Sequence, residues 1–338
     1  MFERALVLGA TGMIGAHGLR AALARGIAAR VLVRPGSDRR SLAGLPVETI
    51  EGDLHDRASL EKALAGCDLA IHAAAPYPKR HFGKARLLAA ARHGMENLLQ
   101  AADATRTDRG GALRRLIYVS SATTIGVPDA ADRRAGRPAR ETDRTRVRDS
   151  APYFPVKFLM EDLARDAAER GVPVVIVNPT FCVDEFDTHR TTAQLMIPLA
   201  RRQLPAYLAG TLNAVPTRDV GAGILLAAER GRIGERYLLG GENLTSREFL
   251  ERCARLAGVP APRHALPRAV AEPISLATEV IAWLTHTPPL FPMTGIRMLR
   301  HAQAYDPTRA REELGYAPTS LDDAIRRAYA WYRAQGWI

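Results

Sequence analysis

Lysine is almost absent from this chain of 338 residues. Four lysines stand beside 43 arginines, and together they exceed the 36 acidic residues by 11 formal charges. The arginines are spread along the chain and interleaved with acids, and a composition rich in arginine and alanine but poor in lysine is what a GC-rich coding sequence would give. The positive charge therefore says little about function, and we expect no nucleic acid partner.

Cysteine is also scarce. The three cysteines, Cys67, Cys182 and Cys253, are too few and too scattered for a disulfide framework or a zinc site. This usage is typical of a protein from a reducing compartment, and we expect no bound metal.

Long apolar runs are missing as well. The most apolar stretch, residues 269–284, is interrupted by Glu272, Pro273 and Glu279, so we expect an amphipathic helix there and not a membrane span. The first nine residues predict a strand and lack the layout of a signal peptide. These features favour a cytoplasmic protein with no membrane partner.

The overall balance of residues is that of a globular protein. Apolar residues make up 47% and charged residues 25%, which excludes a disordered chain, a collagen-like fibre and a coiled coil. In the first half, short apolar runs alternate with helical patterns. We expect strands over residues 5–9, 29–34, 47–51, 68–73, 113–121 and 172–178, and helices over 12–25, 57–65, 84–104 and 154–170. This order predicts an α/β fold with a Rossmann-like, doubly wound parallel sheet.

A glycine-rich turn follows the first strand and opens the first helix. Its sequence is Gly9-Ala10-Thr11-Gly12-Met13-Ile14-Gly15. In that position glycines allow a tight turn and let a pyrophosphate approach the backbone amides of the helix N-terminus. The turn predicts a dinucleotide site that includes Gly9, Thr11, Gly12, Met13, Ile14 and Gly15.

The end of the second strand distinguishes the two common dinucleotides. An NAD site normally has an acid there to bind the ribose 2′-hydroxyl, but this chain has Arg34. Because a guanidinium suits a 2′-phosphate, we expect NADP. NAD is the alternative if Arg34 is only a surface arginine.

Two further strand ends complete the expected cofactor site. Asp53 and Leu54, after the third strand, are placed to reach an adenine. Ala73, Ala74 and Ala75, after the fourth, would let the backbone pass close to a ribose. Each pattern is weak alone.

The alternation of strands and helices ends near residue 178. Residues 179–212 predict loops and one helix, and the C-terminal third is mainly helical with proline-rich joints. We predict that residues 1–178, rejoined by 213–241, form the NADP-binding Rossmann domain. Residues 179–212 and 242–338 would form a smaller, mainly helical substrate-binding region.

A tyrosine and a lysine lie four residues apart where a helix should begin. Tyr153 and Lys157 would share one helix face, and Pro155 between them is tolerated only in the first turn. A nearby ammonium and a cationic oxidised nicotinamide both favour the phenolate, so we expect a lowered pKa for Tyr153, which could exchange a proton with a carbonyl oxygen. Lys157 would also bind the cofactor ribose. Ser121, at the end of the fifth strand, would stabilise charge on the reacting oxygen, or serve only a turn.

These patterns together resemble the extended short-chain dehydrogenases/reductases. The sequence is similar to the NAD(P)-dependent epimerase/dehydratase family, especially its dihydroflavonol 4-reductase-like and hopanoid-associated sugar epimerase-like branch. Besides the motifs above, the matching segments are residues 120–123, 175–179, 232–237, 240–243 and 312–316.

The resemblance implies roles for individual residues. Ser121, Tyr153 and Lys157 would be catalytic. Asn178, Pro179 and Thr180 would lie behind the nicotinamide. The family also implies a homodimer formed through the helices at 84–104 and 154–170.

Three positions depart from the family pattern. Val156 stands where serine is usual, Pro155 is uncommon inside the motif, and Ala91 occupies the place of an asparagine. A polar contact behind Lys157 is then missing, or is supplied by Asn97 or water.

The family contains dehydratases, epimerases and reductases. Ala122-Thr123 replaces the Asp-Glu pair that follows the catalytic hydroxyl of the sugar dehydratases, which argues against dehydration. An NADP site favours reduction of a carbonyl, or oxidation of the alcohol, of a small molecule. A nucleotide-sugar epimerase with tightly bound NAD(P) is the alternative, and a non-catalytic NADP-sensing regulator is a second one.

Two groups of residues are expected near the substrate. Arginines crowd residues 133–148, on a loop that is either solvated or steers an anionic substrate; they are Arg133, Arg134, Arg137, Arg140, Arg144, Arg146 and Arg148. Specificity should come from residues 77–86, 180–212 and 286–296. An apolar wall, or plain core, is expected at Phe181, Cys182, Phe186, Leu195, Met196 and Phe291.

Overall fold

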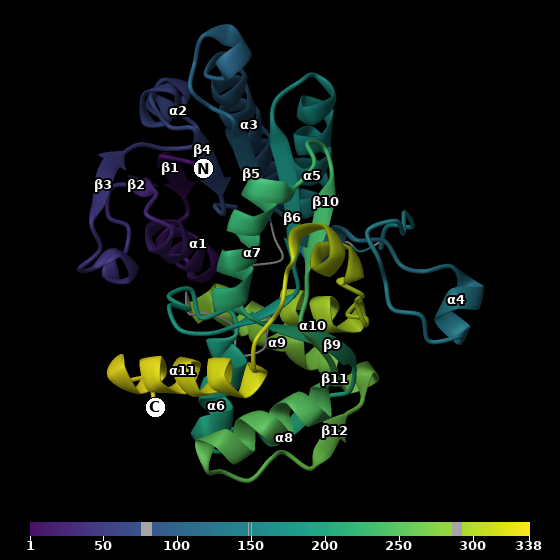
Figure 1. Ribbon diagram of the computed structural model, residues 1–338. Helices are drawn as coiled ribbons and strands as arrows, with labels where there is room; N and C mark the ends of the chain where they lie inside the picture. Colours follow the sequence, from purple (N-terminus) through teal and green to yellow (C-terminus); the bar gives the residue numbers. More distant parts are fainter. Residues whose placement is uncertain (76–82, 148, 150, 286–292) are drawn as a thin grey trace.

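Seven parallel strands form the central sheet of the computed structural model, which describes residues 1–75, 83–147, 149, 151–285 and 293–338. The strands lie in the order β3-β2-β1-β4-β5-β6-β10 (Figure 1). Their bounds are β1 Arg4–Leu8, β2 Ala28–Val33, β3 Val47–Glu51, β4 Leu69–His72, β5 Arg115–Val119, β6 Val174–Pro179 and β10 Arg236–Leu239. The prediction of a doubly wound parallel sheet is confirmed.

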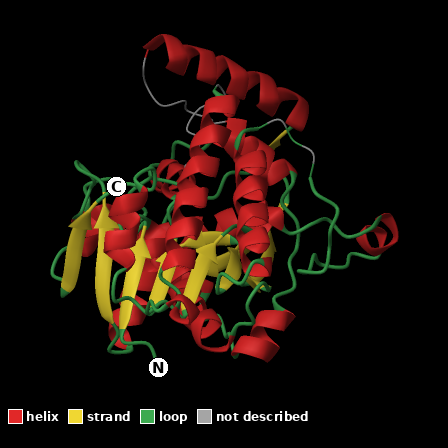
Figure 2. Cartoon of the chain, turned by 90° about the horizontal axis from the view of Figure 1, so that it is seen from above, coloured by secondary structure: helices red, strands yellow, loops and turns green. Residues whose placement is uncertain are grey.

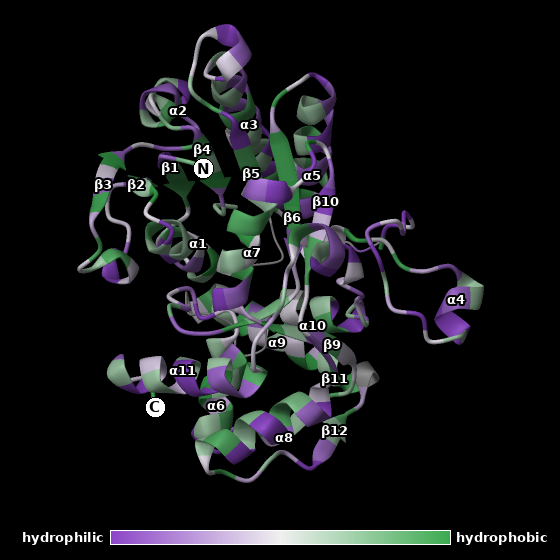
Figure 3. Ribbon diagram, in the orientation of Figure 1, coloured by the Kyte–Doolittle hydropathy of each residue, from purple (hydrophilic) through white to green (hydrophobic). Residues whose placement is uncertain are grey.

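The inner strands are apolar on both faces. On β2, Val31 and Val33 belong to one buried cluster, whereas Leu32 between them belongs to the other. Successive side chains of a strand point to opposite faces, so a continuous apolar run is what a sheet covered on both sides requires. Figure 3 shows β5 and β6 in the hydrophobic colour, in contrast to the charged residues of α4.

Helices cover both faces of this sheet. Helices α1 and α7 pack together on one face, and α2, α3 and α5 on the other (Figure 2). The short α4 projects away from the body in Figures 1 and 2. The helix bounds are α1 Met13–Ala24, α2 Arg57–Leu64, α3 Lys84–Ala104, α4 Ala130–Arg134, α5 Tyr153–Glu169, α6 Ala193–Ala200, α7 Thr217–Arg230, α8 Ser246–Ala257, α9 Arg268–Thr285, α10 Met293–Arg300 and α11 Leu321–Ala334.

The strand order reverses between β1 and β4. In open α/β sheets the crevice at the carboxyl ends of two such strands is where ligands bind. Gly9 follows β1 and Ala73 follows β4 at this point, and the Ala73 amide donates a hydrogen bond to Leu8. The fold therefore brings the predicted glycine turn and the predicted alanine segment to one place.

Smaller sheets lie beyond the central one. β7 Phe181–Val183, β9 Thr211–Pro216 and β11 Glu242–Thr245 form a three-stranded sheet, and β8 Ala206–Leu208 pairs with β12 His264–Leu266. They pack with α6, α8 and α11 around a third apolar cluster. The expectation of loops and one helix for residues 179–212 missed β7 and β8, because three residues are too short for an alternating pattern to emerge. The division of the chain into two domains remains a prediction.

The apolar stretch near residue 280 forms α9, as predicted. Its exposed face is apolar, with Val270, Ile274, Leu276, Val280, Ile281 and Leu284 turned outward. Within the described ranges, we find no helix with both the length and the apolarity needed to cross a bilayer.

Candidate active site

Tyr153 is the first residue of α5, and its hydroxyl donates a hydrogen bond of 3.0 Å to Ser121 Oγ. Ser121 lies two residues after the end of β5, where it caps a short 3₁₀ turn at Ala122–Thr124. Pro155 lies in the first turn of α5, where its missing N–H leaves no helical hydrogen bond unmade. The strand end and the helix start thus bring together two residues that the sequence analysis predicted to react with one substrate.

Lys157 lies one helical turn after Tyr153 and is buried. Its ammonium donates a 3.3 Å hydrogen bond to the carbonyl oxygen of Ser120. Burial lowers the pKa of Lys157 from 10.5 to about 8, and the nearby Glu161 carboxylate opposes that shift.

The pKa of Tyr153 in the chain alone is raised, whereas the expected lowering included the positive charge of a bound oxidised nicotinamide. Burial raises the pKa of the phenol above 10, and the hydrogen bonds with Ser121 and Thr123 offset this only in part. The free-energy cost of removing the phenolate from water is larger here than the stabilisation that it gains from neighbouring groups of the chain. The protein therefore holds Tyr153 as a protonated acid.

A buried polar network supports this site from behind. Glu161 Oε2 accepts hydrogen bonds from Ser120 Oγ at 2.5 Å, Thr124 Oγ1 at 2.5 Å and Asn178 Nδ2 at 2.8 Å. Its other oxygen pairs with Arg236 at 3.1 Å. Sequence reasoning did not identify Glu161 or Arg236, although Glu161 follows Lys157 by one helical turn and therefore shares its face.

The glycine turn has two kinds of glycine. Gly9 has φ +85°, and an added Cβ would lie 2.7 Å from the Ala74 nitrogen; at Gly15 it would lie 2.1 Å from the Gly9 oxygen. Gly12 is different, because its Cβ would come no closer than 3.6 Å to other atoms. Contacts within the protein therefore exclude a side chain at positions 9 and 15 but not at position 12. A pyrophosphate that approaches the turn closely would explain why position 12 is also a glycine.

The other predicted cofactor residues gather around the same crevice. The Arg34 guanidinium is exposed and has no hydrogen bond or ion pair with another described residue. Asp53 is half-buried and accepts a hydrogen bond from the His55 amide. Leu54, Ala73, Ala74 and Ala75 are also half-buried; Ala73 packs against the core on one face of the sheet, and the other three pack against the core on the opposite face.

The segment expected behind the nicotinamide consists of the last two residues of β6 and the residue that follows them. Asn178 is fully buried, and its amide nitrogen donates to the Ser121 carbonyl at 3.1 Å. Asn178 Oδ1 and Thr180 Oγ1 are buried without a hydrogen-bond partner among the described residues, and Pro179 pairs with Leu239 of β10. Unpartnered polar atoms next to the predicted pocket fit a site that is completed by a polar ligand.

The loop at residues 184–192, part of a segment expected to determine substrate specificity, touches the glycine turn. Thr188 Oγ1 donates a 2.9 Å hydrogen bond to the Thr11 carbonyl, and the His189 ring lies 3.7 Å from the Cβ position at Gly12. Phe186, with φ +67°, packs against His17 and under the Arg20 guanidinium. No sequence motif marks this loop, because its residues meet the turn only through the tertiary fold.

Comparison with known proteins agrees with this geometry. The model of the NAD dependent epimerase/dehydratase family matches residues 5–240. The chain belongs to this family. It is therefore an NAD(P)-dependent enzyme of the extended short-chain dehydrogenase/reductase type, as the sequence resemblance implied.

Individual members of the family resemble the whole chain. The putative dihydroflavonol 4-reductase of Synechocystis sp. is 33% identical over 341 residues, covering 98% of this chain and 95% of that protein. Sterol demethylase protein B of Methylococcus capsulatus is 34% identical over 336 residues, covering 98% and 99%. A solved nucleoside-diphosphate-sugar epimerase from Pseudomonas aeruginosa has a TM-score of 0.78 and 31% identity, covering 99% of each chain.

The departures from the epimerase/dehydratase pattern have structural reasons. Val156 and Ala91 are both buried in the apolar cluster between the sheet and its helices, where they pack as core. Asn97 does not replace the missing polar contact, since its amide donates to the Leu54 carbonyl and lies near His93. Asn97 therefore supports the segment after β3 and not Lys157.

The arginine-rich loop does not turn its charges toward Ser121 and Tyr153. Arg137 pairs with Asp132 and Asp143, Arg140 with Asp306, and Arg146 with Asp162. Arg133 and Arg134 are exposed on α4, and Arg148 lies outside the described residues. The interpretation of a solvated loop fits the described arginines better than substrate steering.

Most of the expected apolar wall is core. Met196 and Cys182 are buried in apolar clusters, Leu195 packs against one of them, and Phe181 stacks edge-on against Phe249. Phe186 belongs to the loop over α1. Phe291, and parts of two specificity segments at residues 77–82 and 286–292, lie outside the described residues.

Proposed function

We propose that this protein reduces the carbonyl group of a small molecule with NADPH, through Ser121, Tyr153 and Lys157. The observation that carries the proposal is the 3.0 Å hydrogen bond between Tyr153 and Ser121, one helical turn from a buried lysine. A tyrosine and a serine that meet at the carboxyl edge of the sheet can bind one substrate oxygen from two sides.

The residues have separate tasks in this proposal. A bound nicotinamide would supply hydride to the carbonyl carbon. Tyr153 gives its proton to the carbonyl oxygen as charge develops there, which completes the alcohol, and Ser121 donates a hydrogen bond to the same oxygen. Lys157 holds positive charge beside them. The raised pKa of Tyr153 supports the direction of reduction, because the phenol stays protonated at neutral pH.

The choice of NADPH rests on Arg34. Its guanidinium stands exposed at the end of β2 with no described partner, so its charge is available for a 2′-phosphate. NAD is the other possibility, and Arg34 would then contribute little to binding.

The substrate we propose has a hydrophobic skeleton. The names of two relatives refer to a flavonoid and a sterol, both polycyclic. A cavity of about 480 Å³ between α9, α10 and β8 has mainly apolar walls, formed by Leu208, Ala209, Pro273, Ile296 and Leu299 around the Glu272–Arg300 pair. Beyond the end of α10, His301 lies against Phe154, the neighbour of Tyr153.

An epimerase is the second candidate, because the solved protein from Pseudomonas aeruginosa is named as one. A panel of hydrophobic ketones, aldehydes and nucleotide sugars separates the two, with NADPH absorbance and product analysis as readouts. Net loss of NADPH with alcohol formation is expected. Product without a change in the cofactor would replace the reductase with the epimerase.

A homodimer through α3 and α5 is also proposed, from the resemblance to the family. Light scattering measures it directly. A monomer at micromolar concentration would overturn it.

A further inference from the structure

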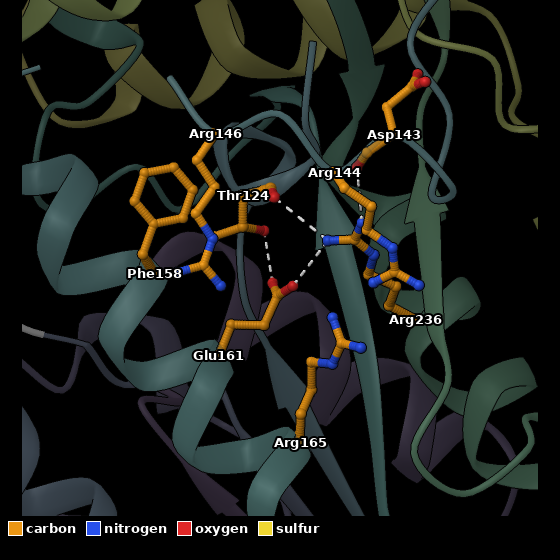
Figure 4. Close-up of a pocket in the computed structure, with 8 residues that line it drawn as sticks. All are labelled: Thr124, Asp143, Arg144, Arg146, Phe158, Glu161, Arg165 and Arg236. Atoms are coloured by element: carbon orange, nitrogen blue, oxygen red, sulfur yellow. Dashed lines mark hydrogen bonds and ion pairs between the residues drawn. The ribbon is translucent and has the colours of Figure 1, made fainter. Parts of the chain in front are cut away.

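A small pocket lies behind the catalytic helix, on the side away from the glycine turn. It has a volume of about 80 Å³ and is lined by Thr124, Asp143, Arg144, Arg146, Phe158, Glu161, Arg165 and Arg236. A water takes up about 30 Å³ in the liquid, so the pocket has room for a group the size of a few waters. Figure 4 shows the side chains of Arg146, Arg165 and Arg236 turned toward the Glu161 carboxylate.

The pocket carries a surplus of positive charge. Four arginines face two acids, which leaves two positive charges uncompensated. The surplus resides on Arg144 and Arg165, because Arg236 pairs with Glu161, Arg146 pairs with Asp162, and Asp143 pairs with Arg137 outside the pocket. The guanidiniums of Arg144 and Arg165 have no ion pair or hydrogen bond with any residue in the described part of the chain.

The floor of the pocket is rigid. Arg236 is 7% exposed and donates to the carbonyl oxygens of Glu141, Thr124 and Asp143 besides pairing with Glu161. Its pKa is lowered mainly by burial, with a smaller contribution from the like charges of Arg144 and Arg165. The fold thus holds guanidiniums close together against their electrostatic repulsion. An anion bound between them would remove that repulsion.

We propose that this pocket binds a phosphate-sized dianion, either free or as the phosphoryl group of a larger molecule. The two uncompensated charges match a dianion such as hydrogen phosphate or sulfate, and the planar guanidinium fork suits tetrahedral oxyanions. Arg144 and Arg165 supply the free donors, while Arg236 fixes the charge at the floor.

This site is separate from the centre where the proposed reduction takes place. Glu161 lies eight residues after Tyr153, which is about 12 Å along the helix axis. Two residues connect the places: Glu161 contacts Arg236 on the pocket side and Ser120 on the catalytic side, and Thr124 lines the pocket and lies against the Ser121 carbonyl. The ligand therefore binds beside a support of the active site and not within it.

The test uses calorimetric titration of the full-length protein, saturated with NADPH, with inorganic phosphate. We expect saturable binding that weakens at least tenfold in the double variant Arg144→Gln/Arg165→Gln. The matched control is Arg133→Gln/Arg134→Gln on α4, which removes the same charge away from the pocket and should bind phosphate as the wild type does. Arg34→Ala should also keep the binding, which separates this pocket from the cofactor site.

Two outcomes would overturn the proposal. One is no phosphate binding by the folded wild-type protein; the other is equal weakening in the pocket and control variants, which would mean general electrostatic attraction. Thermal unfolding of each variant verifies that it is folded. Titration with glycerol phosphate tells the two sources apart, because tighter binding than inorganic phosphate indicates a phosphoryl group on a larger molecule. These results do not depend on whether the protein is a reductase.

Discussion

Tyr153 and Ser121 are hydrogen bonded at 3.0 Å although 32 positions separate them in the chain. The Thr123 hydroxyl also donates to Ser121 Oγ at 3.0 Å. A serine hydroxyl accepts through its lone pairs and donates one proton. The Thr123 amide donates to the same oxygen at 3.3 Å, so three groups share its two lone pairs and one proton.

Replacing Tyr153→Phe removes the proton donor and keeps the ring. We expect NADPH-dependent reduction to fall by about 10²- to 10⁴-fold, the usual contribution of a general acid. NADPH affinity, measured by fluorescence titration, should change far less. Unchanged turnover would refute the catalytic role, and a cellular NADPH response that survives in this variant would favour a sensor.

The rate of reduction should depend on the charge of Lys157. With a pKa of about 8, this group is protonated below pH 8 and loses its charge above it, so the rate should fall as pH rises through that value. The Glu161 carboxylate favours the charged form, so Glu161→Gln should move the descending limb to lower pH. The pH profile of kcat measures both. If Glu161→Gln is folded and its descending limb lies at the same pH as in the wild type, the proposed electrostatic effect of Glu161 on Lys157 is wrong.

Arg34→Ala should weaken NADPH and leave NADH unaffected. Loss of a charge-assisted hydrogen bond of about 1.5–3 kcal/mol corresponds to roughly ten- to a hundredfold in affinity. Binding of both dinucleotides to wild type and variant measures the ratio, with exposed Arg133→Ala as the control. If wild type binds both dinucleotides equally, the assignment of NADP is wrong.

Two glycines of the turn should respond differently to alanine. Gly12→Ala places a Cβ where the chain has space, so stability should stay the same or rise by less than about 1 kcal/mol while NADPH binding is lost. Gly15→Ala forces a Cβ within 2.1 Å of a carbonyl oxygen, so the protein itself should lose at least 1–3 kcal/mol. Chemical denaturation and cofactor titration measure the two effects. Normal NADPH binding by Gly12→Ala would place the pyrophosphate elsewhere.

Breaking the buried ion pair should destabilise the fold. Arg236→Met leaves Glu161 charged and unpaired in the interior, at a cost of about 3–5 kcal/mol. The exposed pair of Arg247 with Glu251 is the control, since Arg247→Met should leave the free energy of unfolding almost unchanged. Urea unfolding gives both values. An equal decrease in the free energy of unfolding in the two variants would mean that the buried pair stabilises the fold no more than the exposed pair does.

Local patterns of the sequence were sufficient for the central sheet, and they predicted that Ser121, Tyr153 and Lys157 are the reacting residues. The glycine turn and the pair Tyr153 and Lys157 depend on short spacings, which a sequence displays directly. Glu161 and Arg236 could not be paired in advance, because they are 75 positions apart and their contact depends on how α5 packs beside β10. The raised pKa of Tyr153 in the chain alone could not be predicted either, since burial is a property of the whole fold.

The loop over the glycine turn also contacts two of the three tryptophans. Trp331 lies 6.4 Å from the Phe186 ring, and the Arg190 guanidinium lies 4.3 Å from the Trp337 ring. Thr188, between these two contacts, is hydrogen bonded to the turn itself. A dinucleotide that displaces the loop must therefore change the surroundings of both indoles, and intrinsic fluorescence becomes a label-free reporter of the nucleotide-bound state.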